Sequence, residues 1–235
     1  MISTEKKNEL KFVCLSDTHN QHPEFLEKGD VLIHCGDFTN RGEYWEIEQF
    51  NQWLDKQKQF KYKIIIAGNH DISFDKNCQK YIYCQKAEDQ INILKTKENC
   101  YYLENSSVEI EGIKIWGSPY SLVYYNGSFQ TTPVESKQLW DQIKEKYDII
   151  ITHGPPYSQQ DFSQSEVQVN AGDKNLFKKI IEIKPQYHIF GHIHEGYGIS
   201  NCQGITFINC SYLKINSRYN KPISFNMSKN QQNNN

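Results

Sequence analysis

Short apolar runs that stop at a polar turn recur along the chain, and they constrain the fold more than any other feature. Five of them matter most: Leu10–Leu15, Val31–Cys35, Tyr62–Ala67, Asp148–Ile151 and Tyr187–Phe190. Such runs are typical of buried strands. Helical patterns stand between some of them. This alternation predicts parallel β-α-β units, in which the polar residues after each strand gather at one edge of the sheet.

The 235 residues are expected to form one domain at 10–227, after a polar N-terminal extension (1–9) and before a disordered Asn/Gln-rich tail (228–235). The patterns predict helices at Glu43–Gln57, Pro133–Lys146 and Asp173–Ile183, a mixture of helix and loop at 85–98, and loops at Gly117–Thr132 and Tyr157–Ala171. Further strands are expected at Tyr101–Leu103, Ser107–Ile110, Ile113–Trp116, Gly204–Asn209 and Pro222–Phe225. In the helix that starts at Pro133, the expected buried residues are Val134, Leu139, Trp140 and Ile143.

Composition excludes several classes of partner. The formal net charge is -2 and the basic residues are scattered, so we expect neither a nucleic-acid polymer nor a membrane surface as partner. No apolar stretch approaches the roughly 18 residues of a membrane-spanning helix, and the N-terminus has no signal-peptide core, which predicts a soluble, cytoplasmic protein. The seven cysteines include no Cys-x-x-Cys pair, so we expect reduced, mostly buried thiols.

The run Tyr187–Phe190 ends at a glycine-rich stretch that contains two histidines, His192 and His194. In extended backbone, residues i and i+2 project to the same face, so both imidazoles would point toward one site. A His-x-His pair alone is a weak signal, because two loop histidines often occur without ligating a metal. The prediction of a metal site therefore depends on whether ligands also follow the other strands.

Ligand-forming side chains do follow the other four strands. Together the five turns hold Asp17, His19, Asp37, Asn69, His153, His192 and His194, with His70 as a further histidine. Imidazole with carboxylate and without thiolate suits Mn, Fe, Zn, Ni or Co better than Mg or Ca. Seven ligands exceed what one ion needs, so we predict two divalent ions. Two such ions carry more positive charge than Asp17 and Asp37 neutralise, and a phosphate ester is the anionic substrate that fits best.

These blocks, in this order, resemble the calcineurin-like metallophosphoesterases. They are Asp17-x-His19, Gly36-Asp37, Gly68-Asn69-His70-Asp71, Thr152-His153-Gly154 and Gly191-His192-x-His194. The stretches 112–119 and 152–156 are also similar to a small metallophosphoesterase-domain-containing subfamily known from animals. The resemblance implies a four-layer αββα sandwich, of class α+β or α/β, in which two mixed β-sheets pack face to face and helices flank them.

The resemblance also implies a role for each residue. One metal ion would be held by Asp17, His19 and His194, the other by Asn69, His153 and His192, and Asp37 would bridge both. His70 would not bind metal; it would act as general acid or stabilise the phosphoryl oxygens. Some members of the subfamily carry glycine at the position of His192, so histidine here supports a complete second metal site.

The implied activity is metal-dependent hydrolysis of phosphoric esters, with hydroxide bridging the two ions attacking phosphorus in line. The subfamily resemblance favours a phosphodiesterase acting on a small cyclic nucleotide. The alternative is a phosphomonoesterase, with a phosphoprotein as one such substrate, and Arg41 is its only support in the sequence. A metal-binding scaffold without turnover is a third hypothesis, against which intact His70 and His192 argue. The oligomeric state stays open.

Some residues near these blocks have two interpretations. Arg41 is either a substrate-binding residue or a surface arginine, and Asp71 either contributes to the substrate site by orienting His70 or begins the next turn. The aromatic side chains of the loop Gly117–Thr132 either stack on a nucleobase or pack the loop onto the sheet; they are Tyr120, Tyr124, Tyr125 and Phe129. His34 and His188, within apolar strands, are predicted core histidines that at most orient a ligand, and His22 is expected to face solvent.

Overall fold

The computed structural model describes residues 8–78, 82–124, 127–163, 169–214 and 218–229. Its first β-sheet has the strand order β15-β1-β2-β3-β4. These strands are β1 (Glu9–Leu15), β2 (Val31–Cys35), β3 (Tyr62–Ile66), β4 (Cys100–Tyr102) and β15 (Ile223–Ser228). Strands β1 to β4 run parallel to one another, as the sequence pattern predicted, whereas β15 pairs antiparallel with β1.

The second β-sheet has the order β13-β14-β12-β9-β6-β5. Its strands are β5 (Ser106–Ile110), β6 (Ile113–Ser118), β9 (Ile149–Thr152), β12 (Tyr187–Phe190), β13 (Gly198–Cys202) and β14 (Ile205–Asn209). The four central strands are parallel, and an antiparallel strand closes each edge. Both sheets are therefore mixed, and in each of them parallel strands end at one common edge.

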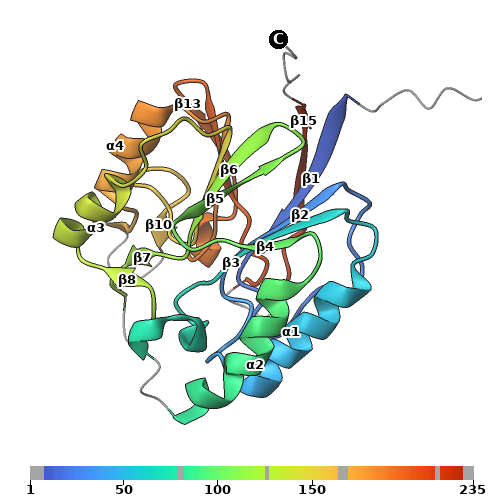
Figure 1. The fold of residues 1–235 in the computed structure, drawn as a ribbon. Coiled ribbons are helices and arrows are strands. Elements are labelled where there is room, and N and C mark those ends of the chain that lie inside the picture. Colours follow the sequence, from blue (N-terminus) through green and yellow to red (C-terminus); the bar gives the residue numbers. More distant parts are fainter. Residues whose placement is uncertain (1–7, 79–81, 125–126, 164–168, 215–217, 230–235) are drawn as a thin grey trace, which may run out of the picture.

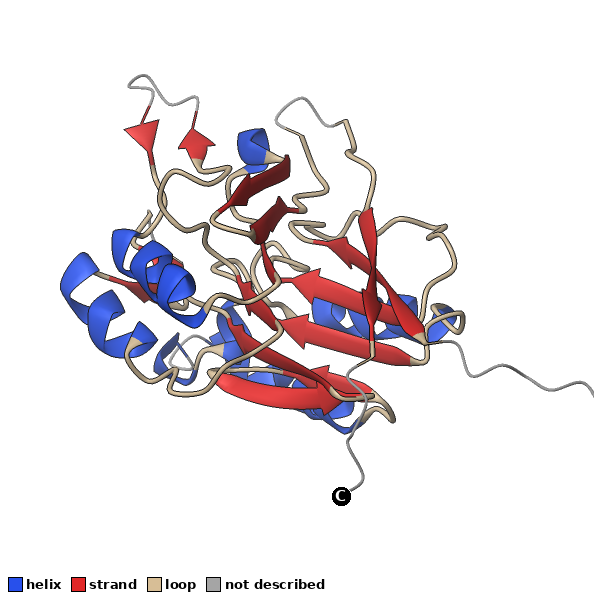
Figure 2. Cartoon of the chain, turned by 90° about the horizontal axis from the view of Figure 1, so that it is seen from above, coloured by secondary structure: helices blue, strands red, loops and turns tan. Residues whose placement is uncertain are grey.

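Two pairs of helices cover the sheets on opposite sides (Figure 1). They are α1 (Tyr44–Lys56) with α2 (Ile82–Thr96), and α3 (Pro133–Trp140) with α4 (Lys174–Ile183). The view turned by 90° shows the strands between the two groups of helices (Figure 2). Short elements complete the described chain: the 3-10 helices η1 (Ile72–Phe74), η2 (Lys76–Cys78) and η3 (His194–Gly196), and the strand pairs β7 (Ser121–Leu122) with β8 (Gln130–Thr131) and β10 (Phe162–Ser163) with β11 (Val169–Asn170).

Three hydrophobic clusters separate the layers. In β1, Phe12 and Cys14 belong to the cluster between the two sheets, and Val13 and Leu15 belong to the cluster under α1 and α2. A third cluster holds Trp140 of α3 against the second sheet. Because both faces of the central strands are buried, their sequences are continuous apolar runs and not alternating ones. The predicted four-layer αββα arrangement is confirmed.

The helix predicted at Pro133–Lys146 ends earlier, at Trp140. The amide of Ile143 donates to the carbonyl of Trp140, so turns replace the helix and place Ile143 in the same buried cluster as Trp140. The prediction that Val134 is buried was wrong: it is 76% exposed. The helix is short, and its buried residues are Ser136 and Trp140.

Other segments are more regular than the sequence suggested. Residues 85–98, predicted as a mixture, belong mainly to the regular helix α2, and the loops predicted at 117–132 and 157–171 contain β7, β8, β10 and β11. Strand β13 was not predicted. Strand β15 extends through Ser228, and the amide of Lys229 donates to the carbonyl of Asn8, so Ser228 and Lys229 are ordered parts of the domain. The rest of the predicted tail, 230–235, lies outside the described residues.

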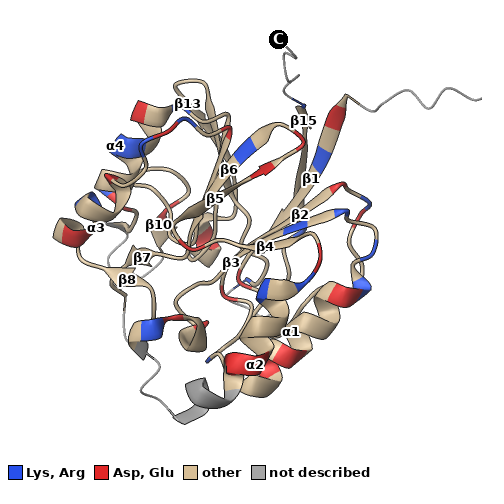
Figure 3. Ribbon diagram, viewed as in Figure 1, with Lys and Arg blue, Asp and Glu red and all other residues tan. Residues whose placement is uncertain are grey.

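Acidic and basic residues are interspersed along the described chain, and α1 and α4 each carry both signs (Figure 3). None of the described helices is both long and apolar enough to cross a membrane. Five cysteines have described side chains, and all five are free thiols, as predicted; they are Cys14, Cys35, Cys100, Cys202 and Cys210.

Three histidines lie beneath the strand ends, of which His34 and His188 are in the core and His22 is half-buried. His34 and His188 are fully buried, and each contacts a threonine hydroxyl, of Thr18 at 3.0 Å and of Thr152 at 2.9 Å respectively. Both were correctly predicted as core residues. The prediction for His22 was wrong, because its Nδ1 lies 2.9 Å from the Thr18 hydroxyl and its ring packs beside aromatic residues of α1. Burial lowers the pKa of each of these three imidazoles to about 3.

The buried His188 predicts a pH-dependent stability. Its pKa is about 3 in the folded protein against an ordinary value of 6.5, so between these values only the unfolded chain binds the proton. The stabilisation is complete above pH 6.5 and is lost as pH falls toward 3. Between pH 7 and pH 5 the wild-type protein should lose about 2 kcal/mol more unfolding free energy than His188→Gln, which has no ring to protonate. Urea unfolding at both pH values measures this difference, and equal losses would contradict the assignment.

Candidate metal centre

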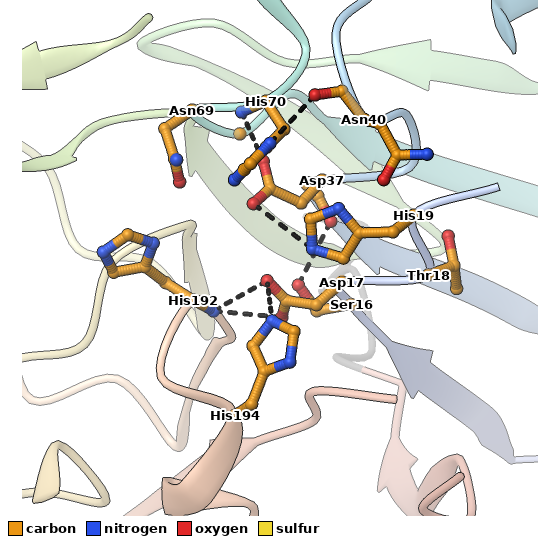
Figure 4. A network of polar contacts seen from close by, with 12 residues as sticks. Ser16, Asp17, Thr18, His19, Asp37, Asn40, Asn69, His70, His192 and His194 are labelled. Atoms are coloured by element: carbon orange, nitrogen blue, oxygen red, sulfur yellow. Dashed lines mark hydrogen bonds and ion pairs between the residues drawn. The ribbon is translucent and has the colours of Figure 1, made fainter. Parts of the chain in front are cut away.

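The predicted ligands converge where strands of both sheets end (Figure 4). Asp17 and His19 follow β1, Asp37 follows β2 and Asn69 follows β3, all in the first sheet. His153 follows β9, and the pair His192 and His194 follows β12, in the second sheet. Because the two sheets pack face to face, the loops of both sheets meet above the shared core, and ligands 175 positions apart in sequence are in contact.

The first group of candidate ligands consists of Asp17, His19 and His194. One ligand atom of each lies within 4.8 Å of the others. His194 Nε2 lies 3.6 Å from Asp17 Oδ1, and the rings of His19 and His194 are 5.5 Å apart. A carboxylate and two imidazoles arranged in this way form a donor set suited to a divalent transition-metal ion.

The second group consists of Asp37, His153 and His192, again with ligand atoms within 4.8 Å of one another. Asn69 joins this group, because its Oδ1 lies 2.9 Å from His153 Nε2. His153 Nδ1 donates to the carbonyl of Cys35 at 2.9 Å, so this nitrogen carries the proton. The other nitrogen, Nε2, is thereby left to serve as a ligand, as is typical of metal-binding histidines.

Asp37 connects the two groups. Its Oδ2 lies 3.8 Å from His19 Nε2 and 3.3 Å from His153 Nε2, so one oxygen faces a histidine of each group. Its Oδ1 accepts a hydrogen bond from the amide of His70 at 2.8 Å. The carboxylate is thus oriented so that Oδ2 faces the space between the two groups.

Backbone strain is concentrated at this site. Four candidate ligands have positive φ angles: Asp17 at 54°, His19 at 42°, Asp37 at 53° and His192 at 70°. Left-handed backbone is uncommon for residues other than glycine, and it persists only where the surrounding structure imposes it. The prediction that His192 and His194 project from extended backbone was therefore wrong, because His192 is left-handed and His194 begins η3. The two rings lie in different groups, as expected for two ions that take one histidine each.

Glycines allow the loops to approach one another. A Cβ atom at Gly191 would overlap Ser16 Oγ and Asp17 Oδ2, and one at Gly68 would overlap Asp37 Oδ1. The amide of His192 can therefore donate to both carboxylate oxygens of Asp17, at 3.1 and 3.0 Å. Any side chain at either glycine would force the ligand loops apart.

Electrostatics keep the carboxylates charged. Burial alone would raise the pKa of Asp17 and of Asp37, but neighbouring histidines, chiefly His194 for Asp17 and His153 for Asp37, hold both well below the usual range. Burial alone would lower the pKa of His153, but Asp37 raises it to about 9. Burial and the charge of His153 lower the pKa of His192 to about 4. Buried carboxylates that stay ionised beside nitrogen donors fit a cation site.

Residues that support the ligands were missed by the sequence analysis. The Ser211 hydroxyl lies 2.9 Å from Asp17 Oδ2 and 2.8 Å from Asn209 Oδ1, and Asn209 Nδ2 donates to the carbonyl of Ile193 at 2.8 Å. Asn209 and Ser211 are both fully buried. They stand at the end of β14, so the signal of a polar turn after an apolar run was present there too.

The candidate role of Asp71 in binding substrate is wrong. Asp71 is fully buried, and its carboxylate accepts hydrogen bonds from the amides of Asp37, Thr39 and Gly68 at 2.8, 2.9 and 2.8 Å. The Thr39 hydroxyl adds a further bond at 2.7 Å. Asp71 therefore joins the loop after β2 to the loop after β3. It does not orient the ring of His70, which contacts the carbonyl of Asn40 instead.

His70 lies at the exposed side of the site, in contrast to the buried ligands. Its ring is 4.8 Å from the ring of His19, and one of its nitrogens lies within 4.8 Å of ligand atoms of His19 and Asp37. Proximity alone would permit His70 to bind metal. However, His70 is exposed, and its Nδ1 already donates to the carbonyl of Asn40. Both observations favour contact with substrate over metal binding.

The other candidates near substrate have mixed outcomes. Arg41 is exposed, and its backbone amide bonds to Glu46. Phe129 is buried and packs against Tyr120, so these two aromatic side chains anchor their loop. Tyr124 is 56% exposed with its ring 6.1 Å from that of His192, which leaves it beside the site. Tyr125 lies outside the described residues.

Similarity to known proteins extends over most of the chain. The model of the calcineurin-like phosphoesterase family matches residues 10–196. Metallophosphoesterase domain-containing protein 1 of Homo sapiens is 37% identical over 228 residues, covering 91% of this chain and 69% of that protein. UPF0046 protein C25E10.12 of Caenorhabditis elegans is 35% identical over 230 residues, covering 93% of this chain and 81% of that protein.

Two solved structures share the fold at low sequence identity. Phosphopantetheinyl hydrolase (PptH) of Mycobacterium tuberculosis matches with a TM-score of 0.57 at 13% identity, covering 86% of this chain and 88% of that one. TT1561 of Thermus thermophilus matches with a TM-score of 0.58 at 12% identity, covering 85% and 88%. At this identity the likeness extends to the fold alone.

Proposed function

The chain belongs to the calcineurin-like phosphoesterase family, and from this premise we propose that it is a dinuclear metal-dependent phosphodiesterase. One observation carries the proposal: the Oδ2 atom of Asp37 faces a histidine of each ligand group, within 3.8 Å of His19 Nε2 and 3.3 Å of His153 Nε2. A single carboxylate oxygen placed between two donor sets supports a bridging role.

The donor set fits two divalent ions. Asp17, His19 and His194 would hold one ion, Asn69, His153 and His192 the other, and Asp37 would contribute to both. When bound, such a pair makes water a nucleophile at neutral pH and stabilises the charge of the phosphoryl oxygens. The protein supplies the ligand geometry through the strained loops and through Cys35, whose carbonyl fixes the ring of His153. The family chemistry and nitrogen-rich donors are compatible with Mn, Fe, Zn, Ni or Co.

His70 would act on the leaving group. Because its Nδ1 donates to the carbonyl of Asn40, the proton that is exchanged with substrate must be carried by Nε2. The Nε2–H bond breaks as a bond forms between that proton and the departing oxygen, and the histidine is left neutral. The exposed position of His70 gives a substrate direct access to this nitrogen.

We propose a small diester, such as a cyclic nucleotide, as substrate. The likeness to the small metallophosphoesterase-domain-containing proteins supports this choice, and Tyr124 beside His192 offers an exposed aromatic face on which a base can stack. A phosphomonoester is the alternative, for which the exposed Arg41 is the only observation.

Hydrolysis of two model esters tests the proposal. Metal-stripped protein reconstituted with Mn should hydrolyse bis-p-nitrophenyl phosphate faster than p-nitrophenyl phosphate, and activity should disappear when a chelator removes the metal. A clear preference for the monoester would reject the diesterase. Absence of turnover on either ester, with two bound ions confirmed by elemental analysis, would favour a metal-binding scaffold.

Metal binding should release protons in a predictable way. The pKa of His153 is about 9 before metal binds, so its ring is protonated at pH 7 and must become neutral to act as a ligand. The pKa of His192 is about 4, so that ring is already neutral. Burial alone would lower the pKa of His194, but the bond and charge of Asp17 raise it. We therefore expect binding at pH 7 to release at least one proton, from His153 and in part from His194, and the affinity to rise with pH toward pH 9.

Calorimetry in two buffers of different ionisation enthalpy measures this proton release. The variant His188→Gln serves as control, because it removes a histidine outside the site and should leave the release unchanged. An affinity that does not vary between pH 6 and pH 8 would contradict the assignment of His153 as a ligand.

A further inference from the structure

The buried carboxylate of Glu46 binds several groups next to the site. It lies in the first turn of α1 and is only 2% exposed. Its carboxylate accepts four hydrogen bonds. The donors are Asn20 Nδ2 at 2.7 Å and the backbone amides of Asn40, Arg41 and Glu43 at 3.0, 3.1 and 2.8 Å. A carboxylate can accept about this many bonds with its two oxygens, so Glu46 is fully occupied in holding other groups.

Three of these donors belong to one loop, at residues 40–43, and that loop also contacts His70. The amide of Asn40 donates to Glu46. The carbonyl of Asn40 accepts from His70 Nδ1 at 2.9 Å (Figure 4). Residue 40 thus connects the buried carboxylate to the imidazole through its backbone. The side chain of Asn40 has no part in this connection.

A carbonyl oxygen can only accept, so this contact sets the proton on Nδ1 and leaves Nε2 directed toward the site. The position of the carbonyl depends on the loop, and the loop depends on Glu46. Without the carboxylate, three partly buried backbone amides would lose their acceptor, and the loop would have to move for them to find other partners.

We infer that Glu46 is a positioning residue, which acts through the backbone of Asn40 to set the ring orientation and tautomer of His70. The inference rests on the proposed role of His70 as proton donor to the leaving group. Glu46 also binds Asn20, which adjoins His19, so the competing explanation is that Glu46 supports the metal ligand His19 instead.

Glu46→Gln is the test variant, because it keeps the size of the side chain but presents an amide group to backbone donors. We expect kcat for a cyclic nucleotide, whose departing ribose oxygen needs a proton, to fall about tenfold, a part of the 10²- to 10⁴-fold that general acids contribute. KM and the content of two metal ions should stay at their wild-type values. Adding Glu46→Gln to His70→Ala should cause less than about a twofold further loss, because residues acting as one unit are not additive.

A spectroscopic readout tests the same inference without turnover. In the zinc-loaded protein, the ¹⁵N shifts of the His70 ring, assigned by their loss in His70→Ala, should show a protonated Nδ1, as its bond to the Asn40 carbonyl requires. In Glu46→Gln they should show a mixture of tautomers or exchange broadening. These spectra remain informative even if the protein hydrolyses neither model ester, so failure of the proposed function is distinguishable from failure of this inference.

Two control variants separate the explanations. Asn20→Gly removes the side-chain bond to Glu46 and suits the positive φ of 64° at that position, and it should leave kcat within about twofold. Asn51→Ala removes a buried polar side chain from the same helix, where Asn51 bonds to Gln90, and should lower stability without changing the His70 spectrum.

The inference is overturned by any of three results. The first is a wild-type His70 spectrum in Glu46→Gln, and the second is an Asn20→Gly variant that reproduces the loss seen in Glu46→Gln. The third is a full tenfold additive loss in the double variant with His70→Ala.

Discussion

Asp37→Asn is expected to remove at least one metal ion per chain and to lower hydrolysis of bis-p-nitrophenyl phosphate by at least about 100-fold. Mutation of a residue that only supports a metal ligand typically lowers metal affinity or activity by 10- to 100-fold. Asp37 faces both ligand groups, so its loss should have a larger effect. Asparagine is chosen because it tolerates the φ of 53° and retains an oxygen that can accept from the amide of His70. The substitution therefore removes the charge and leaves the loop in place.

Elemental analysis and steady-state rates measure these effects together. Asp173→Asn is a matched control, since Asp173 is also a buried aspartate, but its side chain caps α4. This control should keep two ions and wild-type turnover. If Asp37→Asn also kept two ions and full activity, the bridging role of Asp37 would be refuted.

His70→Ala is expected to lower kcat by about 10²- to 10⁴-fold, the range typical of a lost general acid. Two metal ions should remain bound, because His70 is proposed to face substrate and not to ligate. The loss should be larger for a cyclic nucleotide, whose ribose oxygen is a poor leaving group, than for bis-p-nitrophenyl phosphate, whose leaving phenolate needs little protonation.

The comparison of the two esters identifies the role of His70. Equal losses on both substrates would mean that His70 stabilises the phosphoryl oxygens and does not donate a proton. A loss of one metal ion in His70→Ala would instead assign His70 as a ligand together with His19 and Asp37, an arrangement that their proximity permits. The variant His188→Gln should retain wild-type rates and serves as the histidine control.

Much of the fold could be predicted from local patterns. The strands at Val31–Cys35 and Tyr187–Phe190 were located to the residue, and the parallel strands β1, β3 and β9 to within one residue at each end. Both faces of these strands are buried, so their sequences are continuous apolar runs, and such runs are easily recognised. Strand β13 was missed because its residues alternate between half-buried and exposed, and the sequence Gly198–Cys202 is polar.

Within the site, the identity of the candidate ligands was already apparent in the sequence, because each follows a strand and the blocks occur in a specific order. Glu46 carried no such signal, and the block that contains Asp71 did not reveal what its carboxylate binds. In the sequence, a buried carboxylate that binds backbone amides cannot be told from a surface acid near a helix or turn. Only its burial in the structure distinguishes the two.

The sequence by itself therefore determined which side chains stand at the strand ends, since strand patterns and polar turns are local properties of the chain. The tertiary structure alone decided how these side chains face one another. The carbonyl of Cys35 orients His153 across 118 residues, and the Oδ2 atom of Asp37 lies between histidines of two different sheets. Such contacts depend on strand order and on the packing of one sheet against the other, and no local pattern encodes either of them.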